Sequence, residues 1–349
     1  MNSIPNICLV GVQIPFVRGG AEILTESLSL ELKSRGFRTD TINIPFKWHP
    51  KDMILRSCFA ARMLDLTESY TAKIDIVIPF KFPGYVVKHP NKVIWLFHQH
   101  REIYDFYNTD FTSFTESSED HDLRFSLVRL DHKVLKEAKK IFSCSRNVSG
   151  RLMKYCGIES EVLYHPPRLF NRFSCKDFGD YFLSVGRLEL NKRVELIIKS
   201  MKAVSKKKRL IIVGDGPQRG NLSKLAGELG LSDRVSFTGW VDEEELLELY
   251  SNSLGVIYIP QDEDYGYITL EAFASKKPVI AADDSGGVLE FVSNEENGFI
   301  ISPDSKVLAD RMNQLNKKQA RSLGESGYSS IKDLSWDYCI EKLTSYKTK

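Results

Sequence analysis

The chain has 349 residues, of which 42% are hydrophobic and 27% are charged. This composition is typical of ordinary soluble globular proteins and excludes disordered, collagen-like and coiled-coil classes, while the length predicts two domains. A count of 48 Lys and Arg against 46 Asp and Glu leaves a formal charge of +2. Without a protein-wide positive field, nucleic acid is excluded as a main partner.

Apolar, β-branched runs of strand length alternate with amphipathic stretches of helical period along the whole chain. The expected strands cover residues 7–12, 39–44, 74–78, 93–97, 181–185, 210–213, 235–237, 254–259 and 278–281. The clearest expected helices cover residues 21–35, 194–204, 220–229 and 335–346. This alternation predicts an α/β protein with parallel, doubly wound sheets.

Two such series are separated by Tyr164–Arg172, where consecutive prolines forbid a helix and favour an extended connection. We therefore expect an N-terminal domain of residues 1–168, a second domain of residues 169–334 and a terminal helical segment of residues 335–349. The polar stretch 108–122 reads as a long loop, with a short helix as the alternative. Basic runs at 136–140 and 206–209 read as solvated helix ends and loops.

Six cysteines lie far apart without any CxxC pair, so we expect reduced core thiols. The N-terminus has no basic flank and only a short apolar run, and no eighteen apolar residues run together. These features predict a cytoplasmic protein that is at most peripheral at the inner face of a membrane.

Ligands of open parallel sheets bind beyond the carboxyl ends of the strands, so the strand-to-helix loops are informative. Gly19 and Gly20 open a helix and allow the backbone to approach an anion, although a tight turn explains them equally simply. After the strand 181–185, Arg187 and Lys192 can converge on one phosphate group, with solvated surface residues as the alternative.

The most informative loop is Pro260–Ala272, where Gly266 lets the chain turn into a helix whose first amides can bind a phosphate. Glu263 lies in this loop and Glu271 inside the helix. Two carboxylates held in this way can accept hydrogen bonds from two sets of sugar hydroxyls. A general acid and base pair is the competing chemistry, and an acid-decorated helix terminus is the structural alternative.

Other candidate motifs are weaker. The segment Gly214–Gly220 looks like a dinucleotide fingerprint, but its third glycine comes one residue late, so we expect no nicotinamide or flavin site. His98 and His100 end a strand, and we expect one of them to donate to a sugar hydroxyl; metal binding and a core histidine are the alternatives. The arrays Asp120–Asp122 and Asp262–Asp264 are weak cation candidates, and we expect no metal site.

Taken together, these segments resemble the retaining glycosyltransferases of family 4, which have the GT-B fold. The resemblance rests on the order of five motifs: GGAE at 19–22, GRLELNKR at 186–193, GDGP at 214–217, FTGWV at 237–241 and EDYGYITLEA at 263–272. Further matches follow at 278–281, 285–287 and 297–299. The two acids of the fifth motif carry the family's spacing of seven intervening residues.

The resemblance implies two Rossmann-like domains that face a central cleft, an acceptor-side domain first and a nucleotide-sugar donor domain second. The terminal helix would cross back onto the first domain, with Trp336 as an anchor. In the catalytic set, Arg187 and Lys192 would hold the donor diphosphate, Glu263 the transferred sugar, and His98 would touch that sugar. The other donor-binding positions would be Gly20, Gly186, Gly214, Val241, Tyr265, Gly266, Tyr267, Ile268 and Glu271, the last of which would bind the ribose.

The implied activity is a retaining, metal-independent hexosyltransferase. It would move a mannose- or glucose-type hexose from a GDP- or UDP-linked donor to a hydroxyl of a glycan or lipid-linked acceptor, in cell-surface polysaccharide biosynthesis. Apart from this co-substrate no cofactor is expected, because fixed cations and helix amides stabilise the leaving diphosphate. The alternatives are a nucleotide-sugar 2-epimerase and a non-catalytic partner subunit that binds sugar nucleotides.

Overall fold

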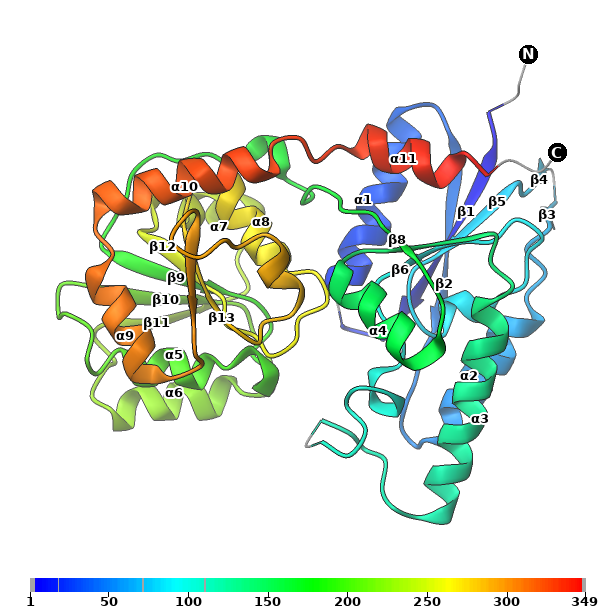
Figure 1. Cartoon of the computed structure of the whole chain (residues 1–349), viewed down its shortest axis with the longest axis horizontal. Coiled ribbons are helices and arrows are strands. Elements are labelled where there is room, and N and C mark those ends of the chain that lie inside the picture. Colours follow the sequence, from blue (N-terminus) through cyan, green and yellow to red (C-terminus); the bar gives the residue numbers. More distant parts are fainter. Residues whose placement is uncertain (1–3, 18, 71, 110, 347–349) are drawn as a thin grey trace. The chain divides into compact units, whose positions relative to one another are not determined.

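A computed structural model describes residues 4–17, 19–70, 72–109 and 111–346 of the chain. It divides into two compact units, one of residues 1–168 with 335–349 and one of residues 169–334 (Figure 1). The expected residues 347–349 at the end of the terminal segment lie outside the described ranges, as do residues 18 and 110 of the two loops discussed above.

The first unit is built on parallel strands in the order β2-β1-β5, continued by β6-β7-β8. Their bounds are β1 Asn6–Gln13, β2 Arg38–Pro45, β5 Ile76–Pro79, β6 Val93–Leu96, β7 Lys140–Ser143 and β8 Glu161–Val162. Two single bridges, Val77 to Lys92 and Lys81 to His98, join the two halves. A separate antiparallel hairpin is formed by two strands of two residues each, β3 Glu68–Ser69 and β4 Ala72–Lys73. When the six parallel strands are renumbered in chain order without this hairpin, their order in space is 2-1-3-4-5-6. Its direction therefore reverses between β1 and β5, the place where such sheets bind ligands.

Among the described residues of this unit, five α-helices pack around these strands (Figure 1). They are α1 Gly20–Ser34, α2 Asp52–Met63, α3 Ser118–Leu135, α4 Arg146–Cys156 and α11 Trp336–Thr344, with single turns η1 Gly84–Val86 and η2 Arg101–Ile103. Helix α1 buries Leu24, Leu28 and Leu32 completely, which is the spacing that the sequence predicted for an amphipathic helix.

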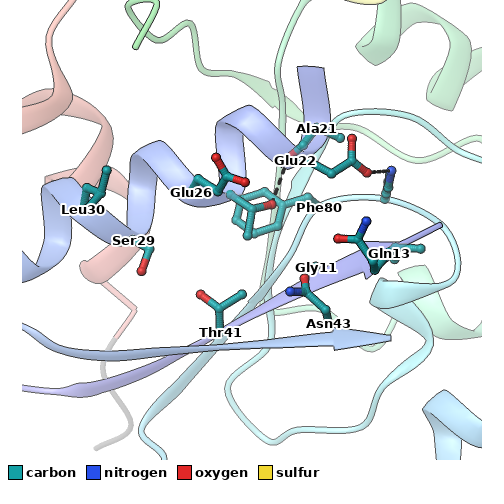
Figure 2. A pocket seen from close by; sticks show the side chains of 13 residues that line it. Gly11, Gln13, Ala21, Glu22, Glu26, Ser29, Leu30, Thr41, Asn43 and Phe80 are labelled. Carbon is teal, nitrogen blue, oxygen red and sulfur yellow. Dashed lines mark hydrogen bonds and ion pairs between the residues drawn. The ribbon is translucent and has the colours of Figure 1, made fainter. Parts of the chain in front are cut away.

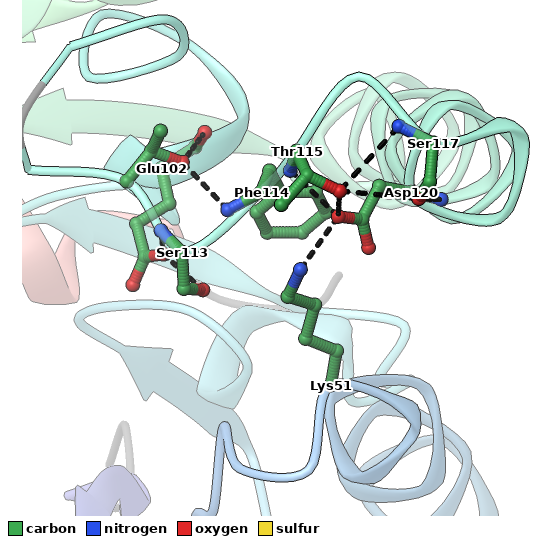
Figure 3. A network of polar contacts seen from close by, with 8 residues as sticks. Lys51, Glu102, Ser113, Phe114, Thr115, Ser117 and Asp120 are labelled. Atoms are coloured by element: carbon green, nitrogen blue, oxygen red, sulfur yellow. Dashed lines mark hydrogen bonds and ion pairs between the residues drawn. The ribbon is translucent and has the colours of Figure 1, made fainter.

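The stretch 108–122 is not wholly the long loop that was predicted, because α3 already begins at Ser118. The Ser117 hydroxyl caps this helix by accepting from the Asp120 amide. Asp120 in turn accepts from the Lys51 ammonium at 2.6 Å and from the Thr115 hydroxyl at 2.6 Å (Figure 3). These partners lower the pKa of Asp120 to about 2. Asp120 thus serves as a structural acceptor in the loop, which removes the support for a cation site at residues 120–122.

The loop that precedes α3 is also held through the carboxylate of Glu102. The Glu102 carboxylate accepts from the Ser113 amide at 2.7 Å and from the Ser113 hydroxyl at 2.6 Å (Figure 3).

The basic run 136–140 also differs from the prediction at its last residue. Lys136 follows the end of α3, but Lys140 begins the buried strand β7.

Helix α11 packs on the first unit through Trp336. Its ring stacks on His165 at 5.6 Å between centroids and meets Trp95 edge to face at 6.3 Å. Ion pairs from Asp337 to Arg35 and from Lys342 to Glu161 flank this contact. The chain's last described residues are therefore part of the first unit's structure.

The second unit contains one parallel sheet of six strands in the order β11-β10-β9-β12-β13-β14. Their bounds are β9 Tyr181–Val185, β10 Arg209–Val213, β11 Val235–Gly239, β12 Gly255–Ile257, β13 Val279–Ala282 and β14 Gly298–Ile301. In chain order this is 3-2-1-4-5-6, the Rossmann order, with its switch point between β9 and β12.

Helices cover both faces of this sheet (Figure 1). They are α5 Val194–Ser200, α6 Arg219–Glu228, α7 Glu243–Asn252, α8 Tyr267–Ala274, α9 Ser305–Gln314 and α10 Lys317–Ile331, with turns η3 Phe170–Arg172, η4 Leu190–Lys192 and η5 Gly287–Glu290. Helix α5 contacts α6 and α9, whereas α8 contacts α10. Both units are thus doubly wound, as the alternation of strand and helix in the sequence predicted.

Candidate functional site

The switch point of the second unit brings together two of the loops that the sequence singled out. A small cavity lies between the carboxyl ends of β9 and β12, and Gly186, Arg187, Lys192 and Tyr258 are among its lining residues. Because neighbouring strands send their connections to opposite faces here, the loops part and leave space for a ligand. This edge of the sheet is the candidate site of the unit.

Glycines allow the loops after β9 and β10 to pack tightly at this edge. Gly186 has a φ of +142° and Gly214 a φ of +119°, a region that side-chain-bearing residues avoid. A Cβ atom at Gly214 would lie 2.1 Å from the Gly186 carbonyl oxygen. Gly214 therefore shapes the site by supporting Gly186 from the neighbouring loop.

The two predicted cations have different partners. The Lys192 ammonium pairs with the Glu263 carboxylate, and both side chains are largely buried, at 17% and 18% exposure. Arg187 is more exposed and lies 2.8 Å from the Glu189 carboxylate. The structure thus joins Lys192 to Glu263, 71 residues further along the chain, while Arg187 lines the same cavity beside its own loop.

The loop that carries Glu263 is fixed through its backbone. The Glu263 amide donates to the Ser285 carbonyl at 3.2 Å, and the Gly287 amide donates to the Glu263 carbonyl at 2.8 Å. Burial, and then the nearby Glu263 carboxylate, raise the pKa of the Tyr258 hydroxyl. Glu263 is consequently anchored by the turn after β13 and lies next to Tyr258 and Lys192.

Helix α8 starts directly after this loop. Gly266 precedes it with a φ of +86°, and a Cβ atom there would lie 2.9 Å from a Val288 methyl group. The first amides of the helix, those of Tyr267 and Ile268, lack partners within the helix by its geometry and carry the positive end of its dipole. The neighbouring Tyr265 ring is fully buried 5.5 Å from Phe291, so its side chain supports the turn by packing.

Glu271 lies one turn into α8, where it accepts a 2.7 Å hydrogen bond from the Tyr250 hydroxyl of α7. Burial raises the pKa of Glu271 to about 7 despite this bond. Tyr250 was not predicted from the sequence, because a tyrosine in an amphipathic helix carries no signal of a contact 21 residues away. It makes Glu271 a fixed acceptor at the edge of the candidate site.

The loop that carries Val241, one of the predicted donor-binding positions, follows β11, whose place in the sheet is two strands away from β9. Trp240 in this loop is 70% exposed and Val241 is half-buried. Gly239 has a φ of +72°, and a Cβ atom there would lie 2.9 Å from the Arg219 guanidinium. The loop therefore lies at the carboxyl edge but not at the switch point itself.

In the first unit, Gly20 opens α1 as expected from the sequence. The preceding Gly19 amide donates at 2.8 Å to the Glu22 carboxylate, which also pairs with Lys81 from the end of β5. The helix start thus has an internal carboxylate close to its amides. A parallel β-bridge joins the backbones of Lys81 and His98, which lie just after β5 and β6, so the ends of these two strands lie side by side.

The two histidines after β6 differ in their surroundings. His98 is half-buried, with its Nδ1 atom 2.8 Å from the Gln99 carbonyl oxygen. His100 stacks on Phe82 at 5.3 Å, and burial lowers its pKa to about 4. Within the described ranges, no group of three or more His, Cys, Asp or Glu side chains is arranged to hold a metal ion.

A buried carboxylate fixes the loop that carries these histidines. Asp131 of α3 accepts from the hydroxyls of Tyr85 and Tyr104, each at 3.0 Å, and from the Gln99 amide at 3.2 Å. Burial raises the pKa of Asp131 to about 6. This network could not be predicted from the sequence, since Tyr85, the segment 99–104 and Asp131 lie far apart along the chain.

The comparisons with known proteins agree with this geometry. Residues 171–330 match the family Glycosyl transferases group 1. The O-antigen chain mannosyltransferase RfbU of Salmonella typhimurium is 32% identical over 153 residues, which cover 43% of each chain. The matched stretches span 33%, 32% and 43% of the length of the first three curated relatives.

Solved structures resemble nearly the whole chain. Sucrose-phosphate synthase from Thermosynechococcus elongatus superposes with a TM-score of 0.78 at 19% identity, over 98% of both chains. HepE of Anabaena, solved with UDP and glucose, gives a TM-score of 0.69 at 15% identity over 97% of this chain and 99% of its own. At these identities the likeness establishes the fold.

The architecture is therefore that of the GT-B fold, with two Rossmann-like units built on parallel sheets. The match to the glycosyl transferases group 1 family covers residues 171–330, which lie in the second unit. The fold class predicted from the sequence is confirmed, and the family match of the second unit agrees with the predicted resemblance to glycosyltransferases. Among the described residues, no helix combines the length and apolar character needed to cross a membrane.

Proposed function

We propose that the protein is a retaining glycosyltransferase of family 4 that transfers a hexose from a nucleotide-diphosphate sugar to a hydroxyl group. The observation that carries this proposal is the gathering of Arg187, Lys192, Glu263 and the start of α8 at the switch point of the second unit. This set offers cations and helix amides to a diphosphate, and carboxylates to the hydroxyls of a sugar and a ribose.

The reaction places different demands on these groups. As the anomeric bond breaks, positive charge develops on the sugar and negative charge on the departing diphosphate. Lys192, Arg187 and the amides of Tyr267 and Ile268 would stabilise that negative charge from fixed positions. Since they supply the charge stabilisation that a bound cation gives elsewhere, we propose turnover without a metal ion.

Lys192 and Glu263 would change partners when the donor binds. In the structure each neutralises the other in a largely buried position. A diphosphate would give Lys192 a second anionic partner, and the hydroxyls of the transferred sugar would give Glu263 new donors. The pair thus holds both side chains in place before binding, which lowers the cost of ordering them. His98 of the first unit remains a proposed contact of the same sugar.

The ribose would be held by Glu271. Its ionised form accepts hydrogen bonds from vicinal hydroxyls, and Tyr250 orients it through the 2.7 Å bond. Gly20, Gly186, Gly214, Val241, Tyr265 and Gly266 complete the proposed donor-binding set through their backbone positions and packing. The proposed donor is a GDP- or UDP-linked mannose- or glucose-type hexose, in keeping with the mannosyltransferase among the relatives and the UDP and glucose bound to HepE.

The acceptor would be a glycan or a lipid-linked glycan of the cell surface. The O-antigen mannosyltransferase among the relatives supports polysaccharide biosynthesis as the setting. A cytoplasmic location, with peripheral contact to the inner face of the membrane, is part of the same proposal.

Donor binding provides the direct test. Thermal unfolding of the full chain would be followed with UDP-, GDP- and ADP-hexoses, because a ligand at a hundred times its Kd stabilises the folded state by about 2.7 kcal/mol. We expect one nucleotide class to raise the midpoint in the wild type and Lys199→Met, but not in Lys192→Met. Lys199 is a matched control because it pairs with Glu195 on the exposed side of α5.

The same preparation tests the stereochemistry. Slow transfer of the hexose to water or methanol would be followed by proton NMR, which distinguishes the anomers of the product. Retention of the donor's anomeric configuration is expected. An inverted product, or no donor of any class that stabilises the protein, refutes the proposal.

A further inference from the structure

Cavities in the two units differ in the chemical groups that line them. Hydroxyl and amide side chains of Ser29, Thr41 and Asn43 line a cavity between α1 and β2 of the first unit (Figure 2). A groove of about 500 Å³ in the second unit instead has a thiol, that of Cys175, in its wall. This volume lies within the range of roughly 300–1,000 Å³ that is typical of small-molecule pockets. We call this second cavity the Cys175 groove.

The Cys175 groove lies between the chain segment that precedes β9 and the helices α8 and α10. Its walls come from residues 173–178, from Ala274 at the end of α8, from Lys276 and from α10. All six cysteines lie within the described ranges, and Cys175 is half-buried whereas the other five are buried. Because the oxidation of a cysteine depends on its exposure, Cys175 is the thiol most open to a small solute such as hydrogen peroxide.

A buried lysine lies directly beside this thiol. Lys277, 102 residues further along the chain, is fully buried, and its Nζ atom is 3.1 Å from the Cys175 Sγ atom. The same nitrogen donates to the Asp177 carbonyl and lies 3.9 Å from the centre of the Phe178 ring. These contacts hold the nitrogen against the sulfur.

Burial also makes this nitrogen more nucleophilic. An ammonium group removed from water is disfavoured, and burial lowers the pKa of Lys277, although its hydrogen bond to the sulfur acts in the opposite direction. A larger fraction of Lys277 is thus the neutral amine, whose lone pair can attack an electrophile. The sequence neighbours of the pair, Lys176 and Lys276, also line the groove, but they are more exposed and form ion pairs with glutamates. Lys277 is therefore the amine placed to react with an oxidised sulfur.

We propose that Cys175 and Lys277 form a peroxide-sensitive modification site in which an S–N bond joins the two side chains. In the first step the sulfur attacks hydrogen peroxide; an S–O bond forms, the O–O bond breaks and one water leaves, so that the sulfur is oxidised to a sulfenic acid while the peroxide is reduced. In the second step the amine attacks that sulfur; an S–N bond forms, and the hydroxyl leaves as water with a proton from the amine. The product is a sulfenamide, and the chain has lost two hydrogen atoms.

The bond would connect the segment before β9 to the segment before β13, whose reacting residues are 102 positions apart. A crosslink across so long a loop removes conformational freedom from the unfolded chain and thereby stabilises the second unit. We expect peroxide treatment to raise the thermal midpoint of this unit by about 10 °C. Dithiothreitol should reverse the rise, because thiols cleave the S–N bond. Neither side chain belongs to the proposed donor-binding set, so the site is independent of the transferase function.

Peptide mapping by mass spectrometry tests the bond directly. The full chain would be treated with hydrogen peroxide, alkylated and digested with trypsin. This digestion leaves Cys175 in the peptide 173–176 and Lys277, which proline follows, in the peptide 277–306. We expect the two peptides to appear joined, with a mass about 2 Da below their sum, and to separate again after dithiothreitol.

The controls use a neighbouring lysine and a second thiol. Lys276→Met, at the adjacent and more exposed position, should leave the joined peptides unchanged. Lys277→Met should abolish them while Cys175 is still oxidised. Cys156 is the internal control, because its sulfur contacts an amide and a hydroxyl rather than an amine, and it should not crosslink.

The wild-type digest decides the matter even if Lys277→Met does not fold. Oxidation of Cys175 to the sulfinic or sulfonic acid without the joined peptides overturns the proposal, as does a wild type that peroxide leaves unmodified at Cys175. Joined peptides that persist in a folded Lys277→Met variant overturn it as well.

Discussion

Glu271 gives the sharpest link between electrostatics and function. Its carboxyl is buried, and that burial raises its pKa from 4.5 to about 7 although the Tyr250 hydroxyl donates a hydrogen bond to it. An ionised carboxylate in this position costs stability in the folded protein. We predict that Glu271→Gln, which has the same shape and no charge, becomes more stable relative to the wild type as the pH rises.

The magnitude follows from the pKa. A folded-state pKa above the unfolded one means that the unfolded chain binds fewer protons between pH 4.5 and 7, so stability falls as the pH rises through this window. A difference of about 2.5 pKa units corresponds to roughly 3 kcal/mol. The stability advantage of Glu271→Gln should thus grow by about 3 kcal/mol between pH 4.5 and 8, or roughly 6–12 °C in midpoint for a domain of this size.

Thermal unfolding of both proteins at a series of pH values from 4.5 to 8 measures this difference. Glu228→Gln, at an exposed position of α6, is the control and should show no growing difference. Glu271→Gln should bind the donor more weakly than the wild type, because the amide cannot accept from two ribose hydroxyls as the carboxylate does. A midpoint difference that stays constant with pH would show that burial does not raise the pKa of Glu271.

Four further outcomes are expected. Lys192→Met should lower kcat by about 10²–10³-fold, the cost of removing one group that stabilises a developing negative charge. The thermal midpoint should also fall, because the largely buried Glu263 carboxylate loses its Lys192 partner. Donor turnover should persist in EDTA; a loss of activity that magnesium restores would contradict metal independence. Trp336→Ala should destabilise the first unit by about 3–5 kcal/mol in urea unfolding, because it removes a buried indole from His165 and Trp95. Gly214→Ala should lower the thermal midpoint and weaken donor binding, since its Cβ atom would clash with the Gly186 carbonyl; unchanged values for both would contradict the packing role.

Regular patterns in the sequence predicted the framework well. Residues 181–185 form β9 as predicted, and α1 differs by one residue at each end from the expected 21–35. Such elements are readable because apolar residues recur at the period of the structure. Strand β8 has only two residues, which is too short for any period, and β7 begins at Lys140 inside a basic run. These elements could not be predicted because tertiary pairing, rather than local pattern, makes them strands.

The candidate site was predictable in part for a related reason. Since ligand loops follow the carboxyl ends of strands, the loops after β9 and β12 could be singled out before their neighbourhood in the sheet was known. The pairing of Lys192 with Glu263 and the support of Glu271 by Tyr250 depend on contacts across 71 and 21 residues. Spacing in one sequence does not encode such contacts. The roles of these residues in donor binding remain predictions.

A crystal structure with a bound GDP- or UDP-hexose would show where the donor diphosphate binds. We predict the diphosphate at the start of α8, with the Lys192 ammonium and Arg187 guanidinium on its oxygens and the ribose on Glu271. A nucleotide bound elsewhere in the second unit, with Lys192 still engaged only by Glu263, would contradict this prediction.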